Sequence, residues 1–234
     1  SVVNFRNSLN PNDLQKANFG KARPETMESY EIGYRAIIDK RLLIDAYYYF
    51  SKYKDFIARE AVARGASGDP STSVPELASP FTSVNFSFVV NSPTPVKANG
   101  WGLSAEYRLG KGYSVTGNVF GDQLSDIQPG LVTFFNTPKT RFNLGVSNSN
   151  TIGKGFGFNI IYKWQNKINW EGAFGSGQIL PFGTLDAQIN YKFSQQKILL
   201  KIGGSNITNH YYRDAFGNPY IGALYYASIV YNVF

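Results

Sequence analysis

The sequence contains no cysteine and only one histidine among its 234 residues. Without cysteine, neither a disulfide framework nor a thiolate metal site can form. With His210 as the single imidazole, a histidine-based metal cluster and most catalytic triads are also excluded. His210 lies in a loop-like segment, where we expect it to be solvated. We therefore predict no metal site, no cofactor and no enzymatic activity.

The chain also lacks an apolar run long enough for a membrane-spanning helix, and its mean hydropathy is −0.24. No apolar signal segment follows Ser1, so we expect that such a segment was removed or that this chain is an internal piece of a longer protein. Charge is not concentrated either. The 23 Lys and Arg and 16 Asp and Glu give a net charge of +7, and the basic residues are scattered. This distribution argues against nucleic acid as a partner.

What the sequence does contain is strict alternation of apolar and polar residues. Between Gly183 and Phe193 the apolar residues fall on one parity and the polar residues on the other. Because successive side chains of a strand point to opposite faces, this segment is predicted to be a strand with one apolar and one polar face. The pattern recurs and predicts about nine strands, which begin near residues 29, 42, 101, 113, 139, 156, 183, 197 and 221.

The connections between these strands are alternately short and long. Tight connections are predicted at 39–41, 110–112, 148–154 and 194–196, and long ones at 60–95, 122–138, 167–182 and 207–219. Within the first long connection, 81–90 has the pattern of a strand extension. Long loops on one side and tight turns on the other are typical of a transmembrane β-barrel.

We therefore predict an all-β fold, an antiparallel transmembrane β-barrel that occupies residues 1–234 as part of one domain. Residues 1–25 are predicted to be an extracellular loop, and residues 26–234 to be strands with short periplasmic turns and long extracellular loops. A soluble β-sandwich also alternates. Aromatic residues make up 16% of the chain, and many lie toward strand ends on the apolar face, as an interfacial girdle requires. That placement favours the barrel.

The long loops hold the candidate ligand-binding residues, since arginines there suit carboxylates and aromatic rings suit sugars or siderophores. The alternative for the aromatics is anchoring at the lipid interface. Paired carboxylates such as Asp45 and Asp55 are instead expected to form ion pairs across strands, and the glycine-rich run at 153–157 is expected to be a hairpin turn. The candidates for ligand contact are Arg59, Arg64, Trp170, Tyr211, Tyr212 and Arg213.

Three motifs resemble those of TonB-dependent outer-membrane receptors. The segment 203–212 (GGSNITNHYY) is similar to the end of the family's penultimate barrel strand, and Phe234 resembles its usual last residue. The segment 23–34 (RPETMESYEIGY) resembles the signature with which these receptors enter a late strand, and Phe5-Arg6-Asn7 resembles the element before it. The short loops and tyrosine runs look most like the receptors of Bacteroidetes-type bacteria.

The resemblance implies a barrel of 22 strands, of which this chain would supply about nine at the C-terminal end. It also implies a plug domain, absent from this chain, through which the TonB complex drives import of a scarce nutrient across the outer membrane. The ligand would be a ferric siderophore, or an oligosaccharide or cobalamin-like molecule. Phe234 would act as the assembly signal. The implied partners are the TonB complex, the barrel-assembly machinery, outer-membrane lipid and lipopolysaccharide, and a surface lipoprotein.

Two other functions are open on the sequence. The chain has the pattern of a passive porin or of a structural β-barrel component of an envelope complex, and the plug that separates these from a transporter lies outside it. An outer-membrane hydrolase would need His, Ser or Asp residues that converge near the outer rim, and a single histidine argues against this. The sequence leaves the ligand and the oligomeric state open.

Overall fold

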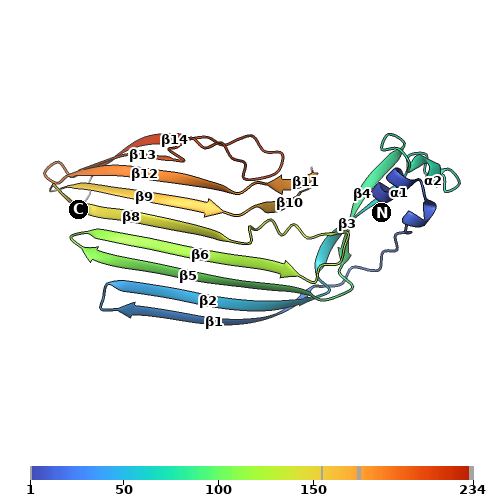
Figure 1. The fold of residues 1–234 in the computed structure, drawn as a ribbon, viewed down its shortest axis with the longest axis horizontal. Coiled ribbons are helices and arrows are strands. Elements are labelled where there is room, and N and C mark those ends of the chain that lie inside the picture. The colour runs from blue at the N-terminus through green and yellow to red at the C-terminus, as the bar shows by residue number, and fades with distance from the viewer. Residues whose placement is uncertain (1, 154, 173–174, 232–234) are drawn as a thin grey trace. The chain divides into compact units, whose positions relative to one another are not determined.

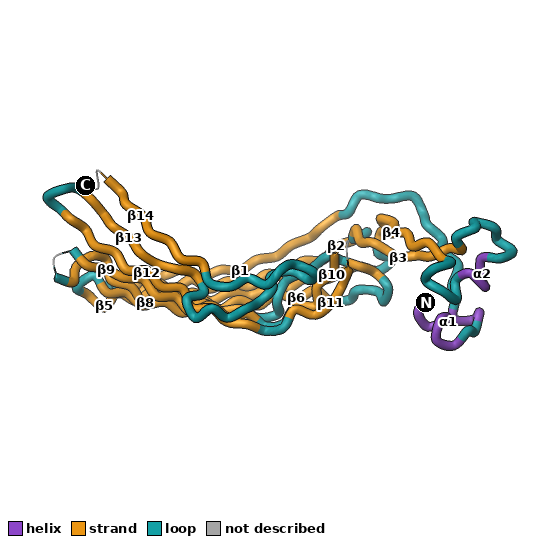
Figure 2. Tube along the Cα trace, turned by 90° about the horizontal axis from the view of Figure 1, so that it is seen from above, coloured by secondary structure: helices purple, strands orange, loops and turns teal. Residues whose placement is uncertain are grey.

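The computed structural model describes residues 2–153, 155–172 and 175–231, and most of these residues lie in antiparallel strands (Figure 1). Nine strands form one sheet in the order β1-β2-β5-β6-β8-β9-β12-β13-β14. Figure 2 shows that these strands lie side by side and curve along their length. Their bounds are β1 Thr26–Ile38, β2 Leu42–Lys54, β5 Val96–Gly110, β6 Tyr113–Ser125, β8 Arg141–Ile152, β9 Phe156–Gln165, β12 Phe182–Phe193, β13 Ile198–Ser205 and β14 Leu224–Tyr231.

The tight turns of this sheet are made by residues in the left-handed region. Asp39 and Lys40 have φ of 49° and 55°, and the Arg41 N–H donates to the Ile38 carbonyl at 3.0 Å. Gly110 and Gly112 have φ of 94° and 75° at the next tight turn. Glycine adopts this region at no steric cost, so short connections can form where two long strands reverse.

The register of the sheet places the two parities on opposite faces, as the alternation predicts. Leu185 pairs with Tyr162 across β12 and β9, and Asp186 pairs with Ile161. The apolar parity is largely open to its surroundings: Leu144 is 55% exposed and Ile202 is 60% exposed. A sheet that leaves its apolar face uncovered requires an apolar environment on that side.

A separate compact unit consists of residues 1–28, 52–97 and 125–134. It contains a three-stranded sheet in the order β4-β3-β7, whose strands are β3 Ile57–Gly65, β4 Ser83–Asn91 and β7 Leu131–Val132. Its small core includes Phe5, Ala58 and Leu77, each less than 10% exposed. The helical elements are α1 Val2–Ser8, η1 Pro11–Asp13 and α2 Ser73–Glu76.

Several predicted boundaries differ from the structure. The segment 1–25, predicted to be loop throughout, contains α1 and η1, which begin before the first strand. The second strand, predicted to begin near residue 42, ends at Lys54, because Asp55 adopts a φ of 51°. The long connection at 60–95 holds β3 and β4, so the strand predicted at 81–90 is confirmed within β4.

The later connections also contain short strands. The segment 122–138 holds β7, and 167–182 holds β10 Ile168–Gly172 and β11 Gly175–Ile179, which pair as a hairpin. The last strand begins at Leu224, later than predicted, and the prediction for Phe234 lies outside the described residues. Among the described residues, no helix is both long and apolar enough to cross a membrane.

Candidate functional site

The polar face of the nine-stranded sheet carries a hydrogen-bonded network that spans four strands. Tyr49 of β2 donates to Asp122 Oδ1 of β6 at 2.8 Å, although β5 lies between these strands. It crosses β5 at Gly100, where a Cβ atom would overlap the tyrosine ring. Arg141 of β8 pairs with Asp122 Oδ2 at 2.9 Å and lies over the Phe120 ring. The Asp122 carboxylate is therefore fully engaged and holds the wall strands in register.

A second ion pair on this face ties the sheet to the loop after β13. Lys163 of β9 pairs with Asp186 Oδ2 of β12 at 2.6 Å. Asp186 Oδ1 accepts a hydrogen bond from the backbone N–H of Asn206 at 2.8 Å. The Asp186 side chain is 20% exposed, so these bonds are partly shielded from water. The loop that begins at Asn206 thus starts from a fixed point on the polar face.

Asn206, the asparagine of the motif at 203–212, fastens the base of this loop. It is 2% exposed and has a φ of 51°, a conformation that asparagine tolerates better than most residues. Its side chain donates to the His210 carbonyl at 2.8 Å and accepts from the His210 N–H at 3.1 Å. Asn209 Oδ1 accepts from the Ala223 N–H at 2.9 Å, which closes the other end. The motif therefore acts as a clasp on the loop of residues 206–223.

Within this loop the predicted residues Tyr211, Tyr212 and Arg213 have different surroundings. Tyr212 stacks on Phe182 with ring centroids 4.2 Å apart, and its backbone pairs with Ile221. Tyr211 is 63% exposed and its ring is open to contact. Arg213 is half-buried and its guanidinium carbon lies 4.2 Å from the centroid of the Tyr220 ring. The loop presents one free tyrosine and one arginine held against a second tyrosine.

Trp170 lies in the β10–β11 hairpin, directly opposite Gly177. The Phe216 ring of the 206–223 loop occupies the space that a side chain at Gly177 would fill, so the loop and the hairpin pack together. Asn136 also binds the hairpin. Its side chain donates to the Glu171 carbonyl and accepts from the Glu171 N–H, both at 2.8 Å. Three segments far apart in the sequence are thereby joined.

The sequence analysis missed Phe216, Phe182 and Asn136 as members of this cluster. A signal for the first was present in Gly175 and Gly177, two glycines on one face of a short strand, because such spacing marks close approach of another segment. No pattern in the sequence distinguishes Asn136 from the other asparagines of the long loops. Its role depends on tertiary placement alone.

Arg59 and Arg64, the remaining predicted residues, lie on β3 in the smaller unit and are exposed. The guanidinium carbon of Arg59 is 5.6 Å from the centroid of the Phe134 ring, and that of Arg64 is 5.4 Å from the Phe86 ring. Each arginine rests on an aromatic ring and keeps its charge accessible. Both belong to a different compact unit from Arg213.

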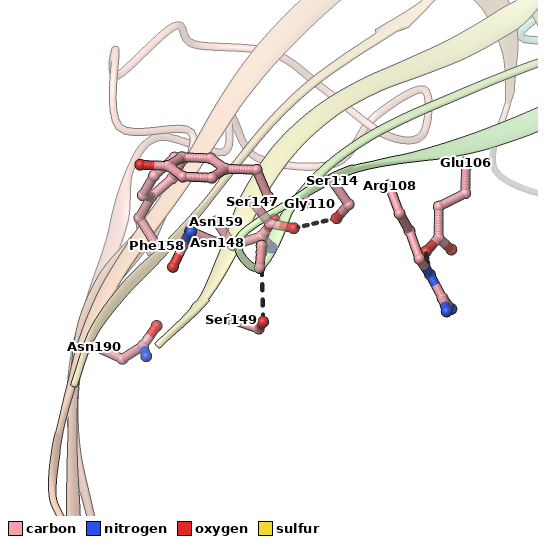
Figure 3. A pocket seen from close by; sticks show the side chains of 12 residues that line it. Glu106, Arg108, Gly110, Ser114, Ser147, Asn148, Ser149, Phe158, Asn159 and Asn190 are labelled. Carbon is pink, nitrogen blue, oxygen red and sulfur yellow. Dashed lines mark hydrogen bonds and ion pairs between the residues drawn. The ribbon is translucent and has the colours of Figure 1, made fainter. Parts of the chain in front are cut away.

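A hollow of about 590 Å³ opens near the tight turn between β5 and β6. Figure 3 shows Ser114 and Ser147 pointing toward one another, and their hydroxyl oxygens are 2.8 Å apart. Glu106 and Arg108, at one end, form an ion pair at 3.1 Å. The lining is rich in hydroxyl and amide groups, which suits a polar peptide or a hydrated solute. The residues that line it include Gly110, Gly112, Asn148, Ser149, Asn159 and Asn190.

The described residues contain no group of three or more His, Asp or Glu side chains that could hold a metal ion. The loop carboxylates are satisfied locally. Hydrogen bonds from Ser71 lower the pKa of Asp69, and hydrogen bonds from Ser67 lower the pKa of Glu76. Carboxyls held in the ionised form in this way are poorly suited to act as general acids.

Comparison with known proteins gives a consistent picture of the fold. The family model described as TonB dependent receptor-like, beta-barrel matches residues 3–209. The solved structures that resemble the chain include the copper transporter OprC, with a TM-score of 0.64 and 13% identity over 89% of this chain and 31% of that one. The FrpB iron transporter from Neisseria meningitidis (F3-3 variant) has a TM-score of 0.63 and 15% identity over 90% of this chain and 32% of that one.

The ferric citrate transporter FecA in its unliganded form has a TM-score of 0.59 and 18% identity over 88% of this chain and 31% of that one. The chain therefore spans about a third of the length of these structures, as their coverage of 31% to 32% states. No curated protein matches the sequence.

Proposed function

Because the chain belongs to the TonB-dependent receptor-like β-barrel family, we propose that it forms wall strands of a receptor that actively imports a scarce nutrient. Such barrels are integral to the bacterial outer membrane, and the chain is part of one. The energy would come from the TonB complex, which would act through a plug domain in the lumen. The family consists of transporters and receptors rather than enzymes.

One observation carries the proposal: the nine-stranded sheet has an uncovered apolar face and a polar face crossed by a hydrogen-bonded network. In a closed barrel the apolar face would contact lipid, and the polar face would line a lumen filled with water or with a plug. A lumen wall this rich in hydroxyl, amide and paired charged groups suits a polar plug. The hollow beside Ser114 and Ser147 is a candidate contact for that plug (Figure 3).

We assign ligand contact to the residues predicted from the sequence, in the outer loops of the receptor. Tyr211 and Arg213 offer an exposed ring and a cation in the 206–223 loop, and Trp170 offers a ring on the hairpin that packs against it. Arg59 and Arg64 would serve from the other unit. The similar structures are named as iron, ferric citrate and copper transporters, which supports an iron chelate as the first ligand class to test. An oligosaccharide or a cobalamin-like ligand stays a candidate.

The other partners are proposed from the family as well. The barrel-assembly machinery would insert the receptor, with Phe234 as its signal, and the apolar face would contact outer-membrane lipid and lipopolysaccharide. A surface lipoprotein would complete a receptor of the Bacteroidetes type.

The test uses the full-length receptor in its own bacterium, with the gene deleted and then restored. Uptake is measured with labelled ferric citrate, a ferric catecholate, a ferric trihydroxamate, cobalamin and a maltodextrin. We expect the restored gene to raise accumulation of at least one of these probes, and we expect that gain to vanish when a protonophore collapses the proton gradient or when TonB is deleted. If the gain persists without the gradient, the receptor is a passive porin. If no probe responds to the gene, the import function is wrong for these ligand classes.

A further inference from the structure

Among the residues that the structure describes, the Arg213 guanidinium has an aromatic partner but no acidic one. Its carbon lies 4.2 Å from the centroid of the Tyr220 ring. Its Nε is shielded from solvent, yet no described residue accepts a hydrogen bond from it. Buried donors in folded proteins nearly always have an acceptor, so this one points to an acceptor supplied by another molecule or another part of the receptor.

Some arginines of the chain pair with a carboxylate, whereas Arg59 and Arg64, like Arg213, lie over an aromatic ring. The adjacent acid, Asp214, forms no ion pair with Arg213 in the described part of the chain, and its Oδ1 accepts a hydrogen bond from Asn218 at 3.0 Å. Arginine normally pairs with a carboxylate where it is partly buried, since its planar fork matches two carboxylate oxygens. Four arginines form ion pairs here, Arg23–Asp55, Arg35–Asp45, Arg108–Glu106 and Arg141–Asp122, and Arg141 is the least exposed of the four, with its side chain 39% exposed.

The position of Arg213 is fixed before any ligand arrives. Tyr212 and Ile221 form an isolated antiparallel bridge, with their backbone hydrogen bonds at 3.2 and 2.8 Å. Arg213 and Tyr220 follow directly as the next residues across this bridge, which brings the guanidinium carbon within 4.2 Å of the ring centroid. The Asn206 clasp and the Phe182–Tyr212 stack hold the rest of the loop. Contact with the ring occupies one face of the guanidinium, and Nε is shielded from solvent, so an outside acceptor would approach the terminal Nη groups.

We propose that Arg213 and Tyr220 form an anion subsite that binds a carboxylate group of the imported ligand. The proposal rests on the proposed import function and deepens it, because it assigns the ligand to the class that carries free carboxylates. Arg213 would supply the paired N–H donors and Tyr220 would hold their plane. An acidic side chain from the rest of the receptor could offer the same chemistry, so the test must separate the two sources.

The experiment measures citrate binding by the purified full-length receptor in detergent, using isothermal titration calorimetry with the wild type, Arg213→Gln and Arg41→Gln. Arg41 is an exposed arginine at the β1–β2 turn, so its replacement removes the same charge at another place. We expect a citrate affinity about tenfold lower for Arg213→Gln and unchanged for Arg41→Gln, since a charge-assisted bidentate contact is lost only in the first. Arg213→Lys keeps the charge without the fork and should recover only part of the affinity.

Three outcomes overturn the proposal: no citrate binding by the wild type, equal binding by the wild type and Arg213→Gln, or equal losses in Arg213→Gln and Arg41→Gln. Melting temperatures of the same proteins without citrate show whether an acidic side chain of the receptor itself pairs with Arg213. If the receptor itself supplies the acid, Arg213→Gln lowers the melting temperature and leaves citrate binding as in the wild type. Binding to the purified receptor needs no proton gradient, so a failure of this subsite and a failure of energised import are distinguishable.

Discussion

At the scale of single residues, Gly100 allows side chains of the polar face to form a hydrogen bond across an intervening strand. Tyr49 and Asp122 are on strands separated by β5, and the tyrosine ring reaches the carboxylate only because Gly100 has no side chain beneath it. Gly102 and Tyr47 repeat this relation along the same strands. Aromatic rings laid over glycines in neighbouring strands shield the backbone where glycine would otherwise weaken the sheet.

Replacing Gly100 with alanine should therefore destabilise the receptor. The new methyl group would overlap both the Tyr49 ring and Asp122 Oδ1, break their hydrogen bond and leave Arg141 to hold the carboxylate alone. We expect a loss of about 1–3 kcal/mol in the free energy of unfolding, as for other overpacked sites. Urea unfolding of the full-length receptor in detergent measures it. Gly33→Ala is the control, since a Cβ there makes only an ordinary contact at 3.6 Å; an equal loss in both variants would contradict this account.

Asn206 offers a second prediction at this scale. Asn206→Ala removes both side-chain hydrogen bonds to His210 and places alanine at a φ of 51°. The expected cost is about 2–4 kcal/mol, because buried backbone groups lose their partners and alanine disfavours this conformation. Limited proteolysis should show faster cleavage within the 206–223 loop. Asn218→Ala removes an exposed asparagine of the same loop, and its cleavage rate should match the wild type; if the two variants are cleaved equally fast, Asn206 is no clasp.

At the scale of elements, the sequence predicts the sheet far better than the loops. Most strands of the nine-stranded sheet have one apolar and one polar face, so alternation marks them, whereas β14 carries apolar or aromatic residues on both faces. The tight turns carry Gly, Asp or Lys at positive φ. The break between β2 and β3 was not predicted, although the apolar parity of β2 ends at Phe50 and Lys52 and Lys54 follow on it. It depends on Asp55, whose side chain pairs with Arg23 at 2.6 Å, a partner that no local pattern reveals.

The same reasoning applies to the candidate site. Arginines and aromatic residues in the loops could be selected by residue type, but the residues that they contact could not. Arg213 faces Tyr220 because of the Tyr212–Ile221 bridge, which forms only in the folded loop. Phe216 was missed because its partner, Gly177, is a residue that offers no side chain. A periodic sequence pattern indicates which residues of a strand share a face. The contacts of Arg213 and Phe216 instead join single residues of distant segments, so no periodic pattern predicts them.

The packing of Phe216 on Gly177 makes a prediction about two elements together. Gly177→Ala would displace the ring and separate the 206–223 loop from the β10–β11 hairpin. We expect amide hydrogen exchange in residues 211–220 to become about tenfold faster, since the loop would lose a packing contact while the Asn206 clasp remains. Ser176→Ala changes the adjacent exposed position of the same strand and should leave exchange as in the wild type. Unchanged exchange in Gly177→Ala would mean that Phe216 does not hold the loop.

At the scale of the whole molecule, the nine-stranded sheet ends in β1 and β14, which lie at opposite edges of its strand order. Each edge strand presents backbone N–H and C=O groups along one side. In the hydrocarbon of a membrane, groups of this kind without partners each cost several kcal/mol. A lipid-exposed sheet is therefore stable only when its edges are joined to further strands.

Residues 1–234 expressed alone with an export signal should accordingly fail to form a monomeric barrel, whereas the full-length receptor should form one. The reason is the row of unpaired backbone groups on the outer sides of β1 and β14. These two edge strands are not paired with each other in the strand order of the sheet. The measurement is heat-modifiable migration in gel electrophoresis together with the intact mass of the membrane-inserted species. We expect the full-length chain to migrate as a compact, protease-resistant barrel and the 26.0 kDa segment to be degraded or to aggregate. A stable monomeric barrel of 26.0 kDa would show that these strands close on themselves. The ligand contacts assigned to Arg213 and Trp170 would then belong to a much narrower pore.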